Sequence, residues 1–367
     1  MTHTPPTPPT PSSPELPSAA HLAATTTAGS ADPGRLVDKF GRVMNYLRLA
    51  VNETCNLRCT YCMPAEGLPF RTGPEILQAD EIIRVVRVCA SLGVQKVRYT
   101  GGEPTLRREL IDLVRAAAQT PGIRSVHLTT NGLLLEKQAR ALREAGCTGL
   151  NISLDTLDAD RFLKITRRAA LPQVLGGLRA ALAEGFPSIK LNVVALRGFN
   201  DDEIGAFAAM TRDEPIGVRF IELMPFDSKQ IWKTGKFLSA ERICKALAEA
   251  YPGLEPASGT STEHHCFRIP GHRGTVSVIP AYTRSLCGAC NRLRITADGK
   301  LRNCLYAHEE FDLLAPLREG ASDDVLRERL QAAVGAKPRD GREAQALGSA
   351  RAQGTAADRG SMTMIGG

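Results

Sequence analysis

Short apolar segments alternate with amphipathic segments through the first two thirds of the chain. The apolar segments have the length and composition of buried strands. They cover residues 44–51, 94–100, 123–129, 148–154, 188–196 and 216–223. Segments with the apolar spacing of helices lie between them, at residues 79–92, 106–118, 133–145, 158–167, 171–184 and 201–211. Strands that alternate with helices pair in parallel through right-handed crossovers, so the sequence predicts an α/β fold with an open or closed barrel.

Polar and sulfur-bearing residues follow directly after the first four strands. These segments are residues 55–62, 101–104, 129–132 and 153–155. Parallel barrels build their active sites where the carboxyl ends of the strands meet. Four such segments in succession therefore indicate one shared pocket. Gly101 and Gly102 would let the backbone approach a ligand closely, although a tight turn before a helix would use them equally well.

Three cysteines fall within eight residues after the first strand, at Cys55, Cys59 and Cys62. A structural zinc site uses four protein ligands, whereas a [4Fe-4S] cluster held by three thiolates leaves one iron open for a further ligand. Two alternatives are half of a zinc site, completed by Cys287 and Cys290, and thiols that lie together by chance. The zinc site is disfavoured because it would close across most of the chain and leave Cys55 unused.

A second set of three cysteines lies past Pro225, where the strand and helix alternation stops and we expect a less regular region. The set is Cys287, Cys290 and Cys304. The strand-like residues 274–280 and an amphipathic helix at 322–334 would give this region a core. A zinc site is a stronger alternative here because a fourth ligand is available from His264, His265, Cys266 or His272.

Arg292 and Arg294 alternate onto one face of an extended segment between these cysteines. Guanidinium groups there can offset the negative charge of thiolates and can also bind phosphate through two parallel hydrogen bonds. The alternative is a solvated strand face.

Composition limits which kind of ligand and which cellular compartment are expected. The chain has 367 residues, enough for one large domain or two ordinary ones, and its charge of +7 weakly favours an anionic ligand. There is no basic run, and aromatic residues make up only 5%, so a nucleic-acid surface is not expected and a small phosphorylated substrate fits better. No stretch is apolar enough to be a secretory signal or a membrane span, and ten cysteines at these spacings indicate a reducing, cytoplasmic setting.

We expect four parts along the chain. Residues 1–37 are rich in Pro, Thr and Ser and would be disordered; the absence of Arg before Arg35 argues against an import signal. Residues 38–225 would form the core barrel, and residues 226–335 would carry the second cysteine set and substrate contacts. Residues 336–367 would be a flexible tail, whose last two glycines could enter a narrow passage.

The chain resembles the GTP 3',8-cyclase family of the radical S-adenosylmethionine (SAM) superfamily, whose members act first in molybdenum cofactor biosynthesis. The resemblance rests on the C-x3-C-x2-C spacing with Tyr61 before the third cysteine, on residues 101–104, on the second cysteine set with its arginines, and on the Gly-Gly end. It covers about residues 40 to 335 and the final few residues.

The resemblance implies a partial (βα)6 TIM-like barrel of the radical SAM type, with a C-terminal extension that carries a second [4Fe-4S] cluster. Ligands of the SAM-binding cluster would be Cys55, Cys59 and Cys62, and those of the substrate-binding cluster Cys287, Cys290 and Cys304. SAM contacts would be Tyr61, Gly102, Ser153 and Met224. GTP contacts would be Arg48, Arg98, Thr129, Lys190, Arg219, Arg292, Leu293 and Arg294. Direct roles in catalysis would fall to Arg292, Arg294, Gly366 and Gly367.

The strand cations agree with these implied roles. Arg48, Arg98, Lys190 and Arg219 lie on four different predicted strands, which a barrel would bring around one axis. Buried cations are costly without an anionic partner, and a triphosphate would provide one.

The implied reaction is radical chemistry on a nucleotide. In the family, an electron from the reduced first cluster cleaves SAM to methionine and a 5'-deoxyadenosyl radical, which removes hydrogen from C3' of GTP. The ribose radical then adds to C8 of guanine, and reduction of the resulting radical, by way of the second cluster, completes the reaction. The product is (8S)-3',8-cyclo-7,8-dihydroguanosine 5'-triphosphate, which makes the enzyme a lyase. The implied partners are an electron donor such as flavodoxin or ferredoxin and the next enzyme of the pathway, which receives the product; the protein would be a monomer or homodimer without nucleic-acid or membrane partners.

Two rival functions remain open at this point. A radical SAM enzyme that modifies a peptide, similar to sulfatase-maturing enzymes, would also carry an auxiliary cluster, but such proteins usually have more C-terminal cysteines than the three found here. A zinc-containing binding module would have no catalysis at all. Metal analysis distinguishes the zinc module from both enzymes.

Overall fold

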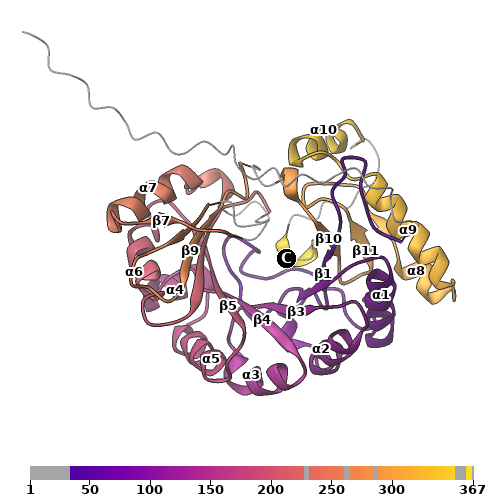
Figure 1. Ribbon diagram of the computed structural model, residues 1–367, viewed down its shortest axis with the longest axis horizontal. Coiled ribbons are helices and arrows are strands. Elements are labelled where there is room, and N and C mark those ends of the chain that lie inside the picture. The colour runs from indigo at the N-terminus through magenta and orange to yellow at the C-terminus, as the bar shows by residue number, and fades with distance from the viewer. Residues whose placement is uncertain (1–33, 227–230, 260–264, 284–286, 352–360, 366–367) are drawn as a thin grey trace, which may run out of the picture. The chain divides into compact units, whose positions relative to one another are not determined.

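The computed structural model describes residues 34–226, 231–259, 265–283, 287–351 and 361–365. Within these ranges, the strands join in one sheet in the order β12-β11-β10-β1-β2-β3-β4-β5-β6-β9-β8-β7. The sheet curves around a central space and the helices lie on its outside (Figure 1). Its two edge strands, β12 and β7, are not joined to one another, so the expected barrel is open.

The six predicted strands form the middle of this sheet. They are β1 (Tyr46–Ala50), β2 (Lys96–Thr100), β3 (Ser125–Thr130), β4 (Cys147–Ser153), β5 (Ser188–Ala195) and β6 (Ile216–Glu222). Each pairs with the next in parallel. The parallel α/β fold predicted from the alternation is thus confirmed for this part of the chain.

Helices connect successive strands across the outer face. They are α1 (Ala79–Ser91), α2 (Leu110–Gln119), α3 (Leu135–Glu144), α4 (Ala159–Thr166), α5 (Leu171–Ala183) and α6 (Ile204–Ala209). Helix α1 begins with a capping box, in which the backbone N–H of Gln78 donates to Glu81 Oε2 over 2.7 Å. Its buried face includes Val85, Val86 and Cys89, so Cys89 is a core residue as the sequence indicated.

Past Pro225, the strand-like residues 274–280, the extended segment with Arg292 and Arg294, and the helix at 322–334 are confirmed. What differs from the expected less regular region is that strands from it extend both edges of the central sheet. Strand β9 (Thr275–Ile279) pairs in parallel with β6, and β10 (Arg292–Ile295) pairs in parallel with β1. Short antiparallel strands follow on either side, namely β7 (Glu255–Pro256), β8 (His265–Arg268), β11 (Lys300–Arg302) and β12 (Phe311–Asp312). Short edge strands give a weak local signal because their stability comes from the neighbour they pair with.

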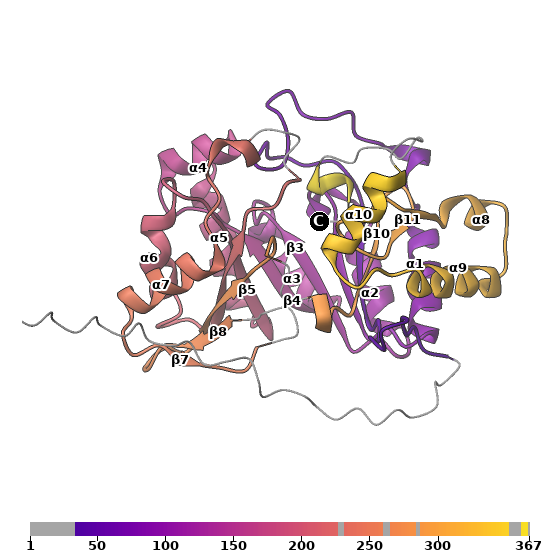
Figure 2. The ribbon, with the colours of Figure 1, turned by 90° about the horizontal axis from the view of Figure 1, so that it is seen from above.

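Four further helices belong to the C-terminal third: α7 (Ala240–Ala250), α8 (Leu314–Arg318), α9 (Asp323–Gly335) and α10 (Gly341–Arg351). Helix α9 lies beside α1 (Figure 2), where Arg84 Nε is 2.8 Å from Asp323 Oδ1. Short 3-10 helices occur at Gly73–Glu75, Pro104–Leu106, Asp201–Glu203, Trp232–Thr234, Cys287–Ala289 and Met362–Met364. Helix α10 and the turn at Met362–Met364 thus occupy parts of the stretch expected to be a flexible tail.

Along each central strand, side chains alternate between the hydrophobic core and the central space that the sheet surrounds. In β1, Leu47 and Leu49 are fully buried in the hydrophobic core, whereas Tyr46 and Arg48 point toward the central space and line cavities there. The strand period of two therefore places charged residues on the inner face without disturbing the core. In the part of the chain that the structure describes, no helix combines the length and the apolar character that crossing a membrane requires.

Candidate functional site

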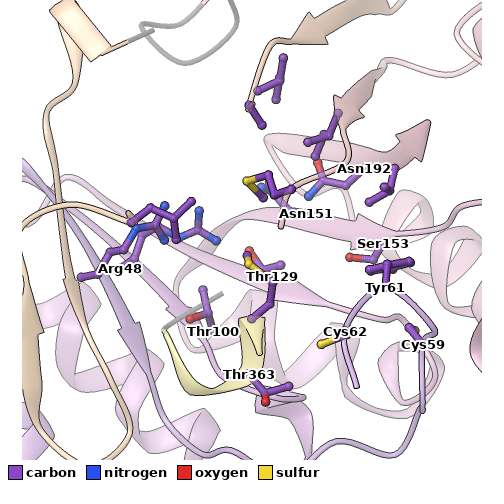
Figure 3. A pocket seen from close by; sticks show the side chains of 18 of the residues that line it. Arg48, Cys59, Tyr61, Cys62, Thr100, Thr129, Asn151, Ser153, Asn192 and Thr363 are labelled. Atoms are coloured by element: carbon purple, nitrogen blue, oxygen red, sulfur yellow. The ribbon is translucent and has the colours of Figure 1, made fainter. Parts of the chain in front are cut away.

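A cavity of about 350 Å³ occupies the centre of the curved sheet. All six cysteines singled out in the sequence line it, together with Tyr61, Gly102, Ser153, Met224, Arg48, Arg98, Thr129, Arg219, Arg292 and Arg294. Figure 3 shows Arg48 on one side of this pocket and Tyr61, Cys59 and Cys62 on the opposite side. The shared pocket expected from the strand ends is therefore present.

The loop that carries the first three cysteines is held against the end of α4. The backbone N–H of Arg58 donates to Thr166 O over 3.1 Å, and that of Thr60 donates to Ile165 O over 2.8 Å. Arg167, in the left-handed backbone region with φ of 59°, donates through Nη1 to the carbonyl oxygens of Arg58 and Met63. These bonds fix the loop through its backbone groups.

The first three thiols suit a metal cluster by their chemistry. Burial raises the pKa of Cys55 to about 12 and raises the pKa of Cys59 and Cys62 as well, and each negative thiolate would disfavour its neighbours. A positively charged iron centre would reverse this cost by stabilising the thiolates. Among the described residues, no three His, Cys, Asp or Glu side chains are placed to hold one single metal ion; a cubane spreads three thiolates over three irons.

The residues expected to contact SAM gather around this loop. Tyr61 Oη donates to Asp155 Oδ2 over 2.7 Å, and Asp155 Oδ1 accepts from the backbone N–H of Val194 over 2.8 Å. Burial raises the pKa of Asp155 to about 6, although both hydrogen bonds oppose the shift. Gly102 must be glycine, because a Cβ there would lie 2.2 Å from the carbonyl oxygen of Glu53.

Glu103 joins two of the strand-end loops. Its buried carboxylate accepts from Thr130 Oγ1 and from the backbone N–H of Asn131, each over 2.7 Å, and from both polar groups of Thr105. Burial raises its pKa, and these bonds partly offset that shift. The segment at residues 101–104 is therefore both a turn before a helix and one wall of the pocket. The two interpretations of Gly101 and Gly102, a tight turn and a ligand contact, are compatible.

The second cysteine set has a different electrostatic setting. Burial alone would raise the pKa of Cys290, but Lys337 and Arg292 more than compensate and lower it to about 6. Lys337 is 2% exposed, and its Nζ donates to Arg292 O over 3.2 Å and to Asn303 O. Burial raises the pKa of Cys287, which lies three positions before Cys290 in the same set. The thiolate form is thus favoured at one of the three positions even before metal binds.

The residues that could complete a zinc site lie elsewhere. His265, Cys266 and His272 are absent from the described lining of the cavity that holds Cys287. Cys266 is in β8, and His272 Nδ1 is 2.8 Å from Thr211 Oγ1. His264 lies outside the described residues.

A row of arginines crosses three parallel strands. The register aligns Arg294 with Arg48 and Arg48 with Arg98. The pKa of Arg48 is held well below its usual value, first by burial and then by the charge of Arg294. In the part of the chain described, the Nε atoms of Arg48 and Arg98 and the hydroxyl of Thr129 are buried without a hydrogen-bond partner. Buried guanidinium groups this close need an anion, so the row fits a phosphate-bearing ligand.

Two asparagines bridge the arginine row to the next strands. Arg219 donates to Asn192 Oδ1 through Nε over 3.0 Å and through Nη2 over 2.6 Å. With its amide oxygen turned toward the arginines, Asn151 accepts from Arg219 and Arg98. These amides are neutral, so they hold the guanidinium groups in place without adding a negative charge.

A second cavity of about 150 Å³ adjoins the first, and Arg48, Arg98 and Arg292 line both. Its remaining described lining is Tyr46, Lys96, His127, Ser188 and Lys190. Lys190, expected among the GTP contacts, therefore faces this smaller cavity. We refer to it as the basic cavity.

Three of the expected contacts are not among the described side chains that line the cavities. Leu293 is fully buried in the core on the opposite face of β10, so only its backbone could reach a ligand. Gly366 and Gly367 lie outside the described residues. The nearby Met362 and Thr363 do line the larger cavity, and Ser361 Oγ is 3.7 Å from Cys62 Sγ.

Sequence reasoning missed several lining residues. Lys96 and Tyr46 lie two positions before Arg98 and Arg48, so strand alternation alone could have placed them on the same face. Asn151 and Asn192 precede Ser153 and Val194 in the same way. Lys337 offered no such signal, because its stretch of sequence shows no strand or helix period.

Two family models match successive parts of the chain. Residues 49–210 match the family model of the radical SAM superfamily, and residues 216–342 match the family described as Molybdenum Cofactor Synthesis C. The chain is 50% identical over 307 residues to the GTP 3',8-cyclase of Chlorobaculum tepidum, which spans 83% of this chain and 92% of that protein. It is 42% identical over 300 residues to the mitochondrial GTP 3',8-cyclase of Arabidopsis thaliana, spanning 82% of this chain and 77% of that one.

A solved structure shares the fold. The crystal structure of Streptococcus suis SuiB gives a TM-score of 0.53 at 15% identity, over 73% of this chain and 62% of that chain. This likeness concerns the fold alone, because identity is low.

Proposed function

Because the chain belongs to the GTP 3',8-cyclase family of the radical SAM superfamily, we propose that its two cysteine sets and the cations between them form one active site. The enzyme is a lyase that converts GTP to (8S)-3',8-cyclo-7,8-dihydroguanosine 5'-triphosphate, the first step of molybdenum cofactor biosynthesis. It uses SAM and two [4Fe-4S] clusters. The observation that carries the site assignment is that six cysteines and five arginines line a single cavity.

In this proposal, Cys55, Cys59 and Cys62 hold the SAM-binding cluster, and Cys287, Cys290 and Cys304 hold the cluster that faces the substrate. Tyr61, Gly102, Ser153 and Met224 surround SAM. The acidic groups Glu103, Asp155 and Glu222 line the cavity and suit the positive sulfonium and amino groups of SAM. Guanine would face the second cysteine set.

The phosphates of GTP would enter the basic cavity. Arg48, Arg98, Lys190 and Arg292 line it, and no carboxylate is among its described lining residues. Arg219, Arg294, Thr129 and the backbone of Leu293 would complete the GTP contacts, while Gly366 and Gly367 would approach the reacting groups from the chain end. With its phosphates in the basic cavity and its guanine at the second cysteine set, GTP would turn its ribose toward the SAM side of the larger cavity.

When bound, the clusters and SAM supply the electron transfer and the radical chemistry of the reaction. The chain itself contributes binding, orientation and exclusion of water. Arg292 and Arg294 fix the nucleotide beside the second cysteine set, and the turn at Met362–Met364 covers the cavity near Cys62. An electron donor such as flavodoxin or ferredoxin and a next enzyme that accepts the product are the partners this reaction requires. We propose a reducing cytoplasmic setting and a monomer or homodimer.

The proposal is tested with anaerobically reconstituted protein, reductant and SAM. We expect 5'-deoxyadenosine and the cyclic nucleotide to form, both by mass spectrometry, when GTP is present, and much less of either with ATP. Equal formation of 5'-deoxyadenosine with ATP or with a peptide would remove the nucleotide assignment. Electron paramagnetic resonance of the second cluster should also change on addition of GTP.

The rival functions receive less support. The match of residues 216–342 to Molybdenum Cofactor Synthesis C and the cyclase relatives favour a nucleotide substrate over a peptide. The same relatives are enzymes, so a zinc-containing module without catalysis is excluded.

A further inference from the structure

The basic cavity contains a histidine whose environment indicates a ligand contact. We propose that His127 binds the terminal phosphate of GTP and takes up a proton when it does so. This proposal rests on the placement of the nucleotide phosphates in the basic cavity. His127 would thereby be a further substrate-binding residue, and GTP binding would be coupled to proton uptake.

The first observation is an unsatisfied ring nitrogen. His127 lies on β3, lines the basic cavity and is 9% exposed. Its Nδ1 is buried and has no hydrogen-bond partner among the described residues. By contrast, Nδ1 of His272 is 2.8 Å from Thr211 Oγ1. Buried polar atoms are nearly always paired, so an unpaired one beside a cavity indicates a missing ligand or water.

The second observation is a space built for the imidazole ring. The sheet register places His127 beside Arg98 on one side and Gly149 on the other. A Cβ at position 149 would lie 2.4 Å from Nδ1 and 2.5 Å from Cε1 of His127. The register of β3 and β4 shifts between Val126 and His127, as in a β-bulge, a feature that redirects side chains. Glycine at 149 is therefore what allows the ring to face the cavity.

The third observation is the charge around the ring. Cations from five other strands line the basic cavity or act on the ring through their charge: Arg48 on β1, Lys96 and Arg98 on β2, Lys190 on β5, Arg219 on β6 and Arg292 on β10. Strand β4 contributes Gly149 beside the ring and no cation. Burial first, and then Arg98 and Lys96, lower the pKa of His127 to about 2. The ring is thus neutral when the cavity holds no anion, despite its position in a phosphate-binding setting.

A bound triphosphate reverses this balance. A phosphate oxygen beside the ring offsets the surrounding cations and accepts a hydrogen bond from the protonated ring. Both effects raise the pKa of His127, so the ring gains a proton. The sign follows from linkage: a pKa that is higher in the complex than in the free protein means proton uptake on binding. Cations around the phosphate lower its pKa, so the phosphate would release protons on binding. Net proton uptake must therefore come from the protein.

Two other groups in the basic cavity titrate, and the pH of the measurement separates them. The pKa of Tyr46 is lowered to about 8, where burial opposes and Arg98 and Arg48 drive the shift, and burial and Arg98 lower the pKa of Lys96 to about 8. At about pH 7 both already hold most of their protons, so neither takes up much more on binding. Uptake at that pH would therefore report on His127.

The experiment is calorimetric titration of GTP into anaerobic protein that contains both clusters, without SAM or reductant. Titrations at about pH 7 in buffers of different ionisation enthalpy give the number of protons bound. We expect uptake of about one proton by the wild type. His127→Gln should take up almost none and bind GTP about ten- to a hundredfold more weakly, while its GMP affinity is unchanged. His272→Gln, outside the cavity, and Tyr46→Phe should retain the uptake.

A second pair of variants tests the geometry and guards against misfolding. Gly149→Ala should weaken GTP binding because its methyl group displaces the imidazole, and it should add little in a His127→Ala background. Iron content and thermal unfolding would verify that each variant is folded. If His127→Gln matches the wild type in GTP affinity and proton uptake, the role of His127 is refuted and the GTP site stands. If the wild type itself does not bind GTP, both the role of His127 and the site assignment fail.

Discussion

The two ends of the central cavity use the same ligand type in opposite electrostatic surroundings. Around Cys55, Cys59 and Cys62 lie the buried carboxyl groups Glu103 and Asp155, and burial raises the pKa of all three thiols. Around Cys290 lie Arg292 and Lys337, which lower its pKa to about 6. One end is therefore arranged for a cationic partner and the other for an anionic one.

This difference explains how one cavity can distinguish its two small molecules. SAM carries a sulfonium and GTP a triphosphate, so each is attracted to one end and disfavoured at the other. Complementary charge also fixes their relative orientation, which a radical reaction between them requires. Variants that change one end of the cavity at a time test this difference.

Loss of a cysteine should have the largest effect. Cys62→Ala should lose about half of the bound iron and all SAM cleavage, whereas Cys290→Ala should lose the other half and the GTP-dependent change of the cluster signal. Iron and sulfide analysis with electron paramagnetic resonance would measure this. Cys244→Ala, on α7 and outside the cavity, should retain all of the iron. If either cavity variant kept its full iron content, the assignment of that cysteine set would be wrong.

Removing one arginine at the basic end should have the next largest effect. Arg294 is buried and aligned with Arg48, so Arg294→Ala should weaken GTP binding roughly a hundredfold and leave both clusters and SAM binding intact. Calorimetry with each ligand would separate the two affinities. Arg140→Ala, an exposed variant on α3, is the matched control. Unchanged GTP affinity in Arg294→Ala would show that this side chain is only a strand charge.

Alkaline pH should weaken GTP binding by a smaller factor. The pKa of Tyr46 and of Lys96 is about 8, so above that value one gains a negative charge and the other loses a positive charge in the same cavity. GTP raises both pKa values, and affinity should fall roughly tenfold or more between about pH 8 and 9.5. Tyr46→Phe should make this dependence shallower, and Tyr251→Phe, outside the cavity, should not. An equally steep profile in Tyr46→Phe would exclude Tyr46 as a source.

The smallest effect should come from Lys337. Its charge lies close enough to Cys290 and Cys304 to interact with both thiolates. A reduced cluster is more negative, so Lys337→Met should make the reduction potential of the second cluster more negative while the first stays unchanged. A redox titration followed by electron paramagnetic resonance measures both clusters in one sample, and the first serves as internal control. Equal shifts in both clusters would argue against a local role.

Local sequence patterns were sufficient to predict much of the fold and the two cysteine sets. The six central strands follow from period-two and period-3.6 spacing, which depends only on near neighbours along the chain. At Leu293, position alone does not say which part of the residue faces a ligand. Its side chain faces the core although both of its neighbours face the cavity, so a contact there would use its backbone. Lys337 shows another limit, because a lysine in an irregular stretch gives no local indication that it will be buried beside a thiol.

The α/β alternation, the two cysteine sets and the cations on the inner faces of the strands can be predicted without a structure, because they follow from spacing along the chain. The tertiary structure decided that β10 pairs with β1, which puts Arg294 beside Arg48 and the second cysteine set across the cavity from the first. It also decided that His127 lies against Gly149 in the basic cavity. Pairing between distant strands depends on which sheet edge remains open after the rest has folded, and no local pattern encodes that.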